Sequence, residues 1–478
     1  MSVKAASAQL LPDSELTDIS TYVCDYKISN QAAFSAACRC FIDSLACAFE
    51  AHQHPECTKL LGPIVPGSHT SYGARVPGTR LELDPATATF NIGVLIRWLD
   101  FNDTFTAKQG SHPSDNVAGI LATADYLSRQ RLLEQRRPLI MKDVFEGIIK
   151  AYEIQGCIAI ENDFNEMGVD HTILTRVATA GVVTRMLGGT YDEVFNAISN
   201  AWLDVSLRVY RQAPLAGSRK GWAAGEAAAQ AVRIAFMAVK GEMGYSQALT
   251  AKKWGFYDLF MKGNPFRFQR PYGDYVIQNV MLKFVASGMH GQSALECAMQ
   301  LHSQVRDRLN EIEKIEIYSH RALIGIMDKT GKLRNPADRD HCVQYIVAVG
   351  LMFGQLKPAD FEDTFAANFR IDELRSKMVV IEEPAFTQSY YDPAKRSNSN
   401  GLKVFFKDGS NTSRLNVEYP AGHPKRRTET ENIFRDKWIN SLSLCFAQKQ
   451  RDVILQMTDD QHIFEEIPVH EFMSAMVA

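Results

Sequence analysis

The chain has no cysteines at the spacing that metal clusters require. Its nine cysteines are scattered over 478 residues, none of them forms a CxxC pair, and the nearest two, Cys38 and Cys40, are two positions apart. Two residues at that spacing point to different sides of a helix. The sequence therefore gives no support for a zinc or iron–sulfur site and favours reduced, buried thiols.

Excess charge and long apolar runs are also lacking. The net charge of −3 argues against nucleic acid or an anionic membrane as the main partner. We expect no membrane helix, because no apolar stretch approaches the roughly 20 residues that one requires. The N-terminus, MSVKAASAQLLPDSELTD, has no apolar core of signal-peptide length and one Lys but no Arg before Asp13. We expect a cytoplasmic protein, or a mitochondrial matrix protein if a presequence has been removed.

Helical patterns fill the first half of the chain. In SNQAAFSAACRCFIDSLACAFE, Ser29 or Asn30 can cap a helix whose apolar residues then repeat every four positions. Segments 86–99, 114–130, 144–160 and 174–187 have similar patterns, rich in Ala and Gly. Residues 221–241 are apolar on nearly every side, which predicts a buried helix.

The pattern changes from about residue 279. Residues 313–320, EKIEIYSH, alternate polar and apolar side chains as a half-buried strand does. Residues 401–420 form two alternating runs around Asp408-Gly409, which predicts a hairpin. Helical patterns return near the C-terminus. We predict a mainly α fold, in which residues 1–278 and 423–478 form a large helical domain and residues 279–422 form an inserted α+β domain.

Acid, hydroxyl and imidazole groups gather in RWLDFNDTFTAKQGSHPSDN, residues 97–116. If 97–104 is helical, Asp100 shares a face with Asp103 and Thr104. Gly110 then ends the helix, and Pro113 restricts His112 to an extended conformation on a loop. The functional interpretation is an acid/base site. The alternative is that the acids cap and solvate a helix end and His112 is a packed loop residue.

A basic, glycine-flanked segment precedes the buried helix. In PLAGSRKGWAAGEAAA, residues 214–229, two glycines surround Arg219 and Lys220. Free N–H groups and the helix dipole favour an anion there, and two cations add to that attraction. The segment is not a phosphate-binding Walker loop, which needs GxxxxGK[ST]. An anion site and a solvated pair of cations both remain open.

Three further residues are ambiguous when each is taken alone. His171 begins a helix, His290 lies in ASGMHGQ, and Tyr345 lies among Val and Ile at helical spacing. Each fits an ordinary capping or core role. Taken with the two clusters above, however, they suggest proton transfer on a polycarboxylate substrate. The competing classes are a non-catalytic carboxylate-binding protein and a helical scaffold, and a scaffold explains buried charge poorly.

Seven motifs spread over nearly the whole chain resemble the MmgE/PrpD family, in its dehydratase branch. They are KLLGPIVPG (59–67), RVPGT (75–79), FNIGVLIRWLDFNDT (90–104), AYEIQGCIA (151–159), SRKGWAAG (218–225), FRFQRPYG (266–273) and NPADRDHCVQY (335–345). The resemblance implies a large helical domain built from both chain ends and a smaller α+β lid. It also implies a homodimer that needs no cofactor, neither a metal nor an iron–sulfur cluster.

The resemblance further implies dehydration of 2-methylcitrate to 2-methyl-cis-aconitate in propionate breakdown. The reaction removes a proton next to a carboxylate and a hydroxyl from the neighbouring carbon. Lys220 is expected to stabilise the developing enediolate, His112 and His171 to serve as acid and base in an order left open, and Asp100 to orient an imidazole. The residues expected to bind the tricarboxylate are Asn102, Thr104, Arg219, His290 and Tyr345.

One segment departs from the family pattern. Relatives usually carry an FPAEFH-like stretch, and this chain has FVASGMH at residues 284–290, which keeps His290 and lacks the Pro and the Glu. If the segment lines the pocket, the change enlarges it and removes a charge. A longer 2-alkylcitrate of secondary metabolism is therefore the alternative substrate. Decarboxylation of cis-aconitate and ligand binding without turnover are weaker alternatives.

Overall fold

The computed structural model describes residues 11–211 and 216–478. The first ten residues, which carry part of our expectation about localisation, lie outside the described part, as do Pro214 and Leu215 of the basic segment. The described chain is mainly helical, as predicted, and its strands form two small sheets.

A first set of helices comes from the N-terminal half and the C-terminal end of the chain. The longer N-terminal members are α1 (Ser14–Asp25), α2 (Gln31–Ala51), α4 (Pro85–Arg97), α5 (Val117–Leu133), α6 (Met141–Glu161), α7 (Thr172–Met186), α8 (Tyr191–Ala201) and α9 (Arg219–Ala238). Shorter members are α3 (Pro55–Thr58), α10 (Phe256–Phe260) and α11 (Tyr275–Gln278), and strands β1 (Ala74–Arg75) and β2 (Glu82–Leu83) pair between α3 and α4. The C-terminal members are α19 (Glu431–Cys445), α20 (Gln448–Thr458), α21 (Gln461–Glu466) and α22 (Val469–Ala475).

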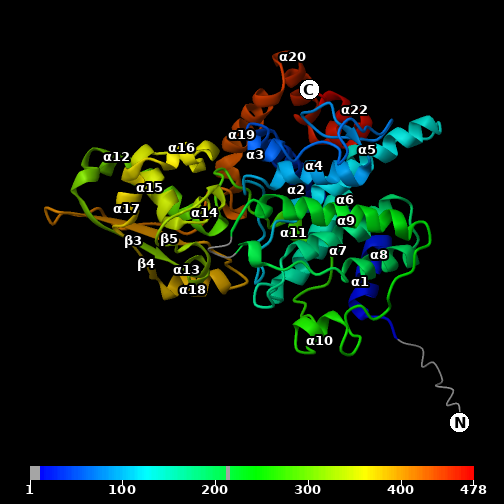
Figure 1. Ribbon diagram of the computed structural model, residues 1–478, viewed down its shortest axis with the longest axis horizontal. Helices are drawn as coiled ribbons and strands as arrows, with labels where there is room; N and C mark the ends of the chain where they lie inside the picture. Colours follow the sequence, from blue (N-terminus) through cyan, green and yellow to red (C-terminus); the bar gives the residue numbers. More distant parts are fainter. Residues whose placement is uncertain (1–10, 212–215) are drawn as a thin grey trace, which may run out of the picture.

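These two groups share one hydrophobic core. Side chains from α1 to α11 pack with Phe434, Trp438 and Leu442 of α19 and with residues of α20 to α22. Figure 1 shows the C-terminal helices lying beside the N-terminal ones, with α19 next to α2 and α3. The chain end therefore folds back onto its beginning.

The middle of the chain forms a second core around a four-stranded sheet. Its helices are α12 (Gln292–Val305), α13 (Arg321–Met327), α14 (Pro336–Arg339), α15 (Val343–Phe353), α16 (Asp363–Ala366), α17 (Phe369–Arg375) and α18 (Pro384–Tyr391). Its strands are β3 (Ile312–Ser319), β4 (Met378–Glu382), β5 (Asn400–Phe406) and β6 (Leu415–Val417), in the order β4-β3-β5-β6. Only β3 and β4 are parallel. The core includes buried residues from Ala294 to Val417, and Figure 1 shows these elements as a separate body beside the large helical one.

The local predictions for this middle region are confirmed. β3 covers the alternating segment 313–320, and β5 and β6 pair antiparallel around Asp408-Gly409, where Gly409 has a φ of +83°. The domain boundaries at 279 and 422 stay a prediction. Val280 and Leu282, which follow the first of them, still pack into the first core.

One expectation about apolar length was wrong. Helix α2 has 21 residues and an 18-residue window with a mean hydropathy of 1.4, enough by length and composition to cross a membrane. Ala and Cys occupy the positions between the larger apolar residues, so the apolar length of the helix exceeds what its four-residue repeat suggests. In the structure 83% of that window is buried inside the protein, where α2 packs on α4, α6 and α19.

Candidate active site

The segment after α4 is not a continuation of that helix. α4 ends at Arg97, Asp100 has a left-handed φ of +50°, and Thr104 pairs in a β-bridge with Met281. Our assumption that residues 97–104 are helical was therefore wrong. Lys283 donates from its Nζ to the carbonyl oxygen of Asp100 at 2.7 Å, a contact from a distant segment that holds the turn.

Asp103 and Asn102 face inward, away from the cavity described below. The Asp103 carboxylate accepts hydrogen bonds from the backbone and hydroxyl of Ser114, and Asn102 donates to Ser114 and Asp115. Both are almost fully buried, and burial raises the pKa of Asp103 to about 6. The Asn102 side chain therefore holds the loop that carries His112, and its contact with substrate stays a prediction.

His112 is extended before Pro113, as predicted, and its tautomer follows from its contacts. Its Nδ1 lies 2.6 Å from the backbone oxygen of Asp103. Because a carbonyl oxygen only accepts, Nδ1 carries the proton and Nε2 keeps its lone pair. Burial, and then Arg97 and Lys283, hold the pKa of His112 well below its usual value. The imidazole is thus neutral with a free basic nitrogen.

Asp100 is the centre of a buried charge cluster. Its carboxylate pairs with Arg97, lies 3.4 Å from the Lys283 ammonium, and lies 3.6 Å from His112 Nε2. Burial by itself would raise the pKa of Asp100, but Arg97, Lys283 and Lys220 hold it well below its usual value. Asp100 is therefore an anion held opposite the basic nitrogen of His112.

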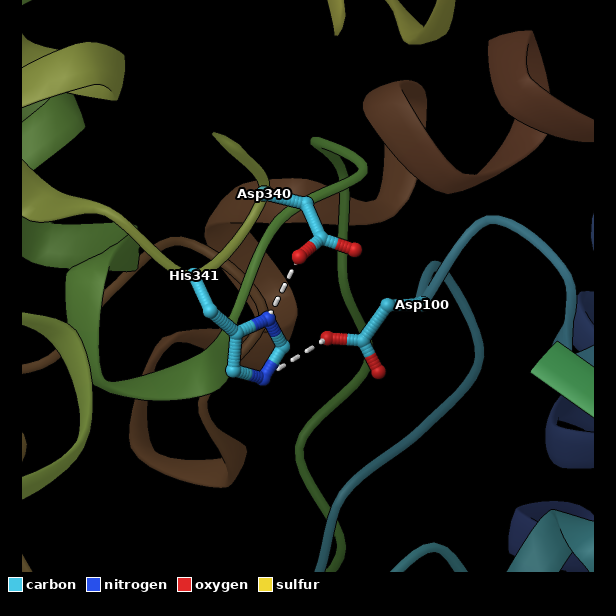
Figure 2. Close-up of side chains that lie close together, drawn as sticks. All are labelled: Asp100, Asp340 and His341. Atoms are coloured by element: carbon cyan, nitrogen blue, oxygen red, sulfur yellow. Dashed lines mark hydrogen bonds and ion pairs between the residues drawn. The ribbon is translucent and has the colours of Figure 1, made fainter. Parts of the chain in front are cut away.

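Lys220 connects this cluster to the second core. Its Nζ lies 2.7 Å from both oxygens of Asp340 and 2.8 Å from Nδ1 of His341. His341 Nδ1 also lies 2.7 Å from Asp340, and its Nε2 lies 3.7 Å from Asp100. Figure 2 shows the His341 ring between the two carboxylates. A carboxylate pair, an imidazole and an ammonium group thus meet where the two cores meet.

His171 begins α7, as predicted, and it does not cap the helix with its side chain. Its ring centre lies 5.7 Å from that of His112, and its Nε2 is buried without a hydrogen-bond partner. Burial lowers the pKa of His171 to about 3, although the neighbouring Asp170 opposes that shift. Asp170 itself is paired with Arg211. A neutral imidazole with an unused nitrogen therefore lies opposite His112.

A cavity of about 300 Å³ is lined by Asp100, His112, His171, Lys220 and His341 from this cluster. Six of the nine residues predicted for the site line it, and they are Asp100, Thr104, His112, His171, Lys220 and His290. Met289, which belongs to the segment that departs from the family pattern, lines the cavity too. The walls come from both cores, so the site exists only when the cores are docked.

Two further residues predicted for the site lie outside the cavity, and their role in binding stays a prediction. Arg219 is exposed and stacks on the rings of Tyr210 and Trp222, because the first turn of α9 directs it away from Lys220. Tyr345 is buried in the second core, where its hydroxyl donates to the Asp360 carbonyl oxygen. Neither side chain lines the cavity.

Four charged or titratable residues of the cluster were missed, and they are Arg97, Lys283, Asp340 and His341. A signal existed for three of them. Arg97 precedes Asp100 by three residues. Asp340 and His341 lie within the NPADRDHCVQY motif, of which only Tyr345 was predicted to belong to the site. Lys283 has no local signal, because it reaches Asp100 across 183 positions of sequence.

Asp100, Asp340 and His341 also have the composition of a metal site. Their ligand atoms all lie within 4.8 Å of one another. However, the Lys220 ammonium already lies against Asp340 and His341, and Arg97 and Lys283 already neutralise Asp100. Two carboxylates that face three cations hold no excess negative charge for a divalent ion. In this structure the three cations therefore occupy the surroundings of the two carboxylates.

Comparison with known proteins places the chain in a family. Residues 17–269 match the MmgE/PrpD N-terminal domain, and residues 285–462 match the MmgE/PrpD C-terminal domain. The chain belongs to the MmgE/PrpD family. The family's C-terminal domain extends over α19 and α20, although the side chains of these helices pack into the first core.

Curated members of the MmgE/PrpD family resemble the chain over nearly its full length. A 2-methylcitrate dehydratase of Cupriavidus necator is 52% identical and covers 99% of each chain, and one of Salmonella typhimurium is 52% identical and covers 97% of each. A mitochondrial 2-methylcitrate dehydratase of Yarrowia lipolytica is 42% identical and covers 98% of this chain and 91% of its own. A 2-methylcitrate dehydratase-like protein of Aspergillus oryzae is 39% identical.

Proposed function

We propose that the chain is a hydro-lyase that dehydrates 2-methylcitrate to 2-methyl-cis-aconitate. The observation that carries the proposal is the basic Nε2 of neutral His112, held beside Asp100 in a cavity lined by cations. Identity of about half with curated 2-methylcitrate dehydratases over the whole chain supports the substrate.

His112 acts as the base in this proposal. The proton lies on the carbon that bears the methyl group and a carboxylate, and His112 Nε2 removes it. The imidazolium that forms lies beside ionised Asp100, 3.6 Å from Nε2, which stabilises its charge. Because the backbone oxygen of Asp103 accepts a hydrogen bond from Nδ1–H of His112, the ring keeps its orientation when Nε2 gains the proton.

Lys220 acts on the developing negative charge. Removal of the proton moves charge onto the adjacent carboxylate and forms an enediolate, and a preorganised cation stabilises that form. Lys220 is already fixed by Asp340 and His341, so it needs no rearrangement when the charge appears. Arg97 and Lys283 keep the surrounding potential positive.

His171 acts as the acid for the leaving hydroxyl. In the free protein the pKa of His171 is about 3, so its ring is neutral at physiological pH. A bound tricarboxylate places negative charge beside the ring, which raises its pKa and favours a proton on Nε2. Water then leaves from the carbon next to the one that lost the proton.

The alternatives are less well supported. A longer 2-alkylcitrate was suggested by segment 284–290, where the sequence departs from the family pattern. Over its whole length, however, the chain is more similar to the bacterial 2-methylcitrate dehydratases than to the Aspergillus relative. Binding without turnover does not explain two unpaired imidazole nitrogens that face one cavity, on His171 and His290.

The direct test is turnover of 2-methylcitrate by the purified protein, followed by the ultraviolet absorbance of the unsaturated product. Citrate and a longer 2-alkylcitrate are compared under the same conditions. We expect 2-methylcitrate to be preferred, and His112→Gln to lose activity by about 10²–10⁴-fold. Binding of 2-methylcitrate without product would refute the dehydratase assignment, and preference for the longer substrate would restore the alternative.

Three further properties belong to this proposal. We propose a homodimer, on the strength of the family resemblance, and sedimentation of the purified chain tests it.

We propose catalysis without a metal or other cofactor, since Lys220 lies against Asp340 and His341. We also propose the cytoplasm or the mitochondrial matrix as the compartment, because the relatives include bacterial proteins and one named mitochondrial.

A further inference from the structure

Arg208 is a half-buried cation at the wall of the cavity. It lines the cavity beside His171, and its Nε is buried without a hydrogen bond. Among residues 11–211 and 216–478, no carboxylate lies within ion-pair distance of its guanidinium group. Burial lowers the pKa of Arg208, the nearby Asp170 carboxylate opposes that shift, and the neighbouring Arg211 adds to it. An anion that enters the cavity would supply the direct charged hydrogen bonds that this guanidinium lacks.

The more deeply buried cations of the cavity already have carboxylates. Arg97 pairs with Asp100, Lys220 with Asp340, and Arg211 with Asp170. Lys329 lies 3.5 Å from Asp338, and Lys108 is exposed. Asp163 also lines the cavity, but one of its oxygens accepts the backbone amides of Asn165 and Glu166. Among the described residues, Arg208 is thus the half-buried cation of the cavity wall that has no carboxylate within ion-pair distance.

The backbone fixes Arg208 next to His171. Val169 and Leu207 form a β-bridge, the Asp170 amide donates to the Ser206 oxygen at 2.8 Å, and the Arg208 amide donates to the Gly168 oxygen at 3.0 Å. Segments 168–171 and 206–208 therefore run side by side. Arg208 and His171 therefore lie in neighbouring segments of the same cavity wall, where one ligand can contact both.

One of the three carboxylates of the substrate takes no part in the reaction. Two of its carboxylates are bonded to the two reacting carbons, and the third ends a CH₂ arm. That arm is attached to the carbon that loses its hydroxyl, which is the carbon that His171 faces in the proposed function. We infer that Arg208 binds the carboxylate of the CH₂ arm and so selects tricarboxylates over dicarboxylates. This inference rests on the proposed function, because it uses the orientation assigned there.

The test compares two substrates in wild type and Arg208→Gln. 2,3-Dimethylmalate keeps both reacting carbons and their carboxylates but has a methyl group in place of the arm. We expect Arg208→Gln to lower kcat/KM for 2-methylcitrate by about 10²-fold, mostly through KM, because a bidentate charged hydrogen bond is lost. The kcat/KM for 2,3-dimethylmalate should change little, and Arg208→Lys should recover part of the loss.

A second readout needs no turnover. Tricarballylate, which has three carboxylates, and succinate, which lacks the arm, are used as competitive inhibitors. Arg208→Gln should weaken tricarballylate by about 10²-fold and leave succinate nearly unchanged. The ratio of the two inhibition constants is independent of the fraction of folded protein, so partial misfolding does not imitate the result.

Arg233→Gln is the matched control, since it removes the same charge from an exposed side chain of α9 that does not line the cavity. It should leave both ratios unchanged. Equal losses for the substrates with and without the arm, or no loss in Arg208→Gln, would overturn the inference. Failure of the wild type to dehydrate 2-methylcitrate would instead overturn the proposed function, and the two failures are therefore distinguishable.

Discussion

The ammonium group of Lys220 lies 2.7 Å from each carboxylate oxygen of Asp340, although 120 positions separate the two residues. Lys220 belongs to α9 of the first core, and Asp340 follows α14 of the second. The pair therefore ties the two cores together at the cavity and also holds the cation that the proposed reaction uses.

Removal of one member of this pair should be costly. Lys220→Met or Asp340→Asn leaves a buried group without its partner and should lower the free energy of unfolding by roughly 2–4 kcal/mol. The double variant should lose less than the sum of the two. Urea unfolding measures these energies, with Lys240→Met on an exposed lysine as control. Additive losses would show that the pair contributes no coupling.

Activity of Lys220→Met should fall by about 10³-fold.

The packing of α4 on α9 should depend on Gly225. A Cβ built there would lie 2.9 Å from the Phe90 carbonyl oxygen and 3.0 Å from the Val94 amide nitrogen, both in the backbone of α4. Gly225→Ala must push the helices apart and should cost about 1–3 kcal/mol of stability. Calorimetry gives the size of the loss. Gly325→Ala, where nothing lies within 4 Å, is the stability control. A melting temperature as high as that of the wild type would contradict the close approach.

Stability should fall in mild acid because of His171. Its folded pKa of about 3 is below the unfolded value, so between these pH values the unfolded chain binds a proton that the folded chain does not. The stabilisation is therefore present above the unfolded pKa and is lost as the pH falls. Between pH 7 and pH 5 the loss should be about 2 kcal/mol for this residue. His171→Gln should lack it.

The comparison of wild type with His171→Gln removes an opposing effect. Burial raises the pKa of Asp115 to about 7, so this carboxyl gains its proton in the folded state first and adds stability as the pH falls. Both proteins keep Asp115, and its contribution cancels in the difference. Urea midpoints at pH 7 and pH 5 supply the four values. Parallel pH dependence in the two proteins would show that His171 is not buried in neutral form.

Chelators should leave activity unchanged. The only described cluster of metal-ligating side chains at the cavity, Asp100, Asp340 and His341, already lies against Lys220, Arg97 and Lys283. Protein dialysed against a strong chelator should retain its kcat/KM, measured against protein dialysed in buffer alone. Loss of activity that Mg²⁺ or Fe²⁺ restores would contradict this expectation.

Local features of the fold were predictable because their causes are local. The four-residue apolar repeat predicted helix α2. At its N-terminus the Asn30 side chain accepts a hydrogen bond from the Ala32 amide, as a capping residue does. The two-residue alternation gave β3, and Asp408-Gly409 gave the hairpin. The helical assumption for residues 97–104 failed for the opposite reason. A bond from Lys283 holds Asp100 in a left-handed turn, and no pattern near Asp100 records it.

The sequence by itself determined the helices and strands, the extended loop that carries His112, and the family motifs around the cavity. Only the tertiary structure decided which side chains face that cavity, including Arg208, and which ones, such as Asn102 and Tyr345, turn into the packed interior. The physical reason is the range of each interaction. Helix and strand periodicity relates residues a few positions apart, whereas buried ion pairs form between segments that meet only when the two cores dock.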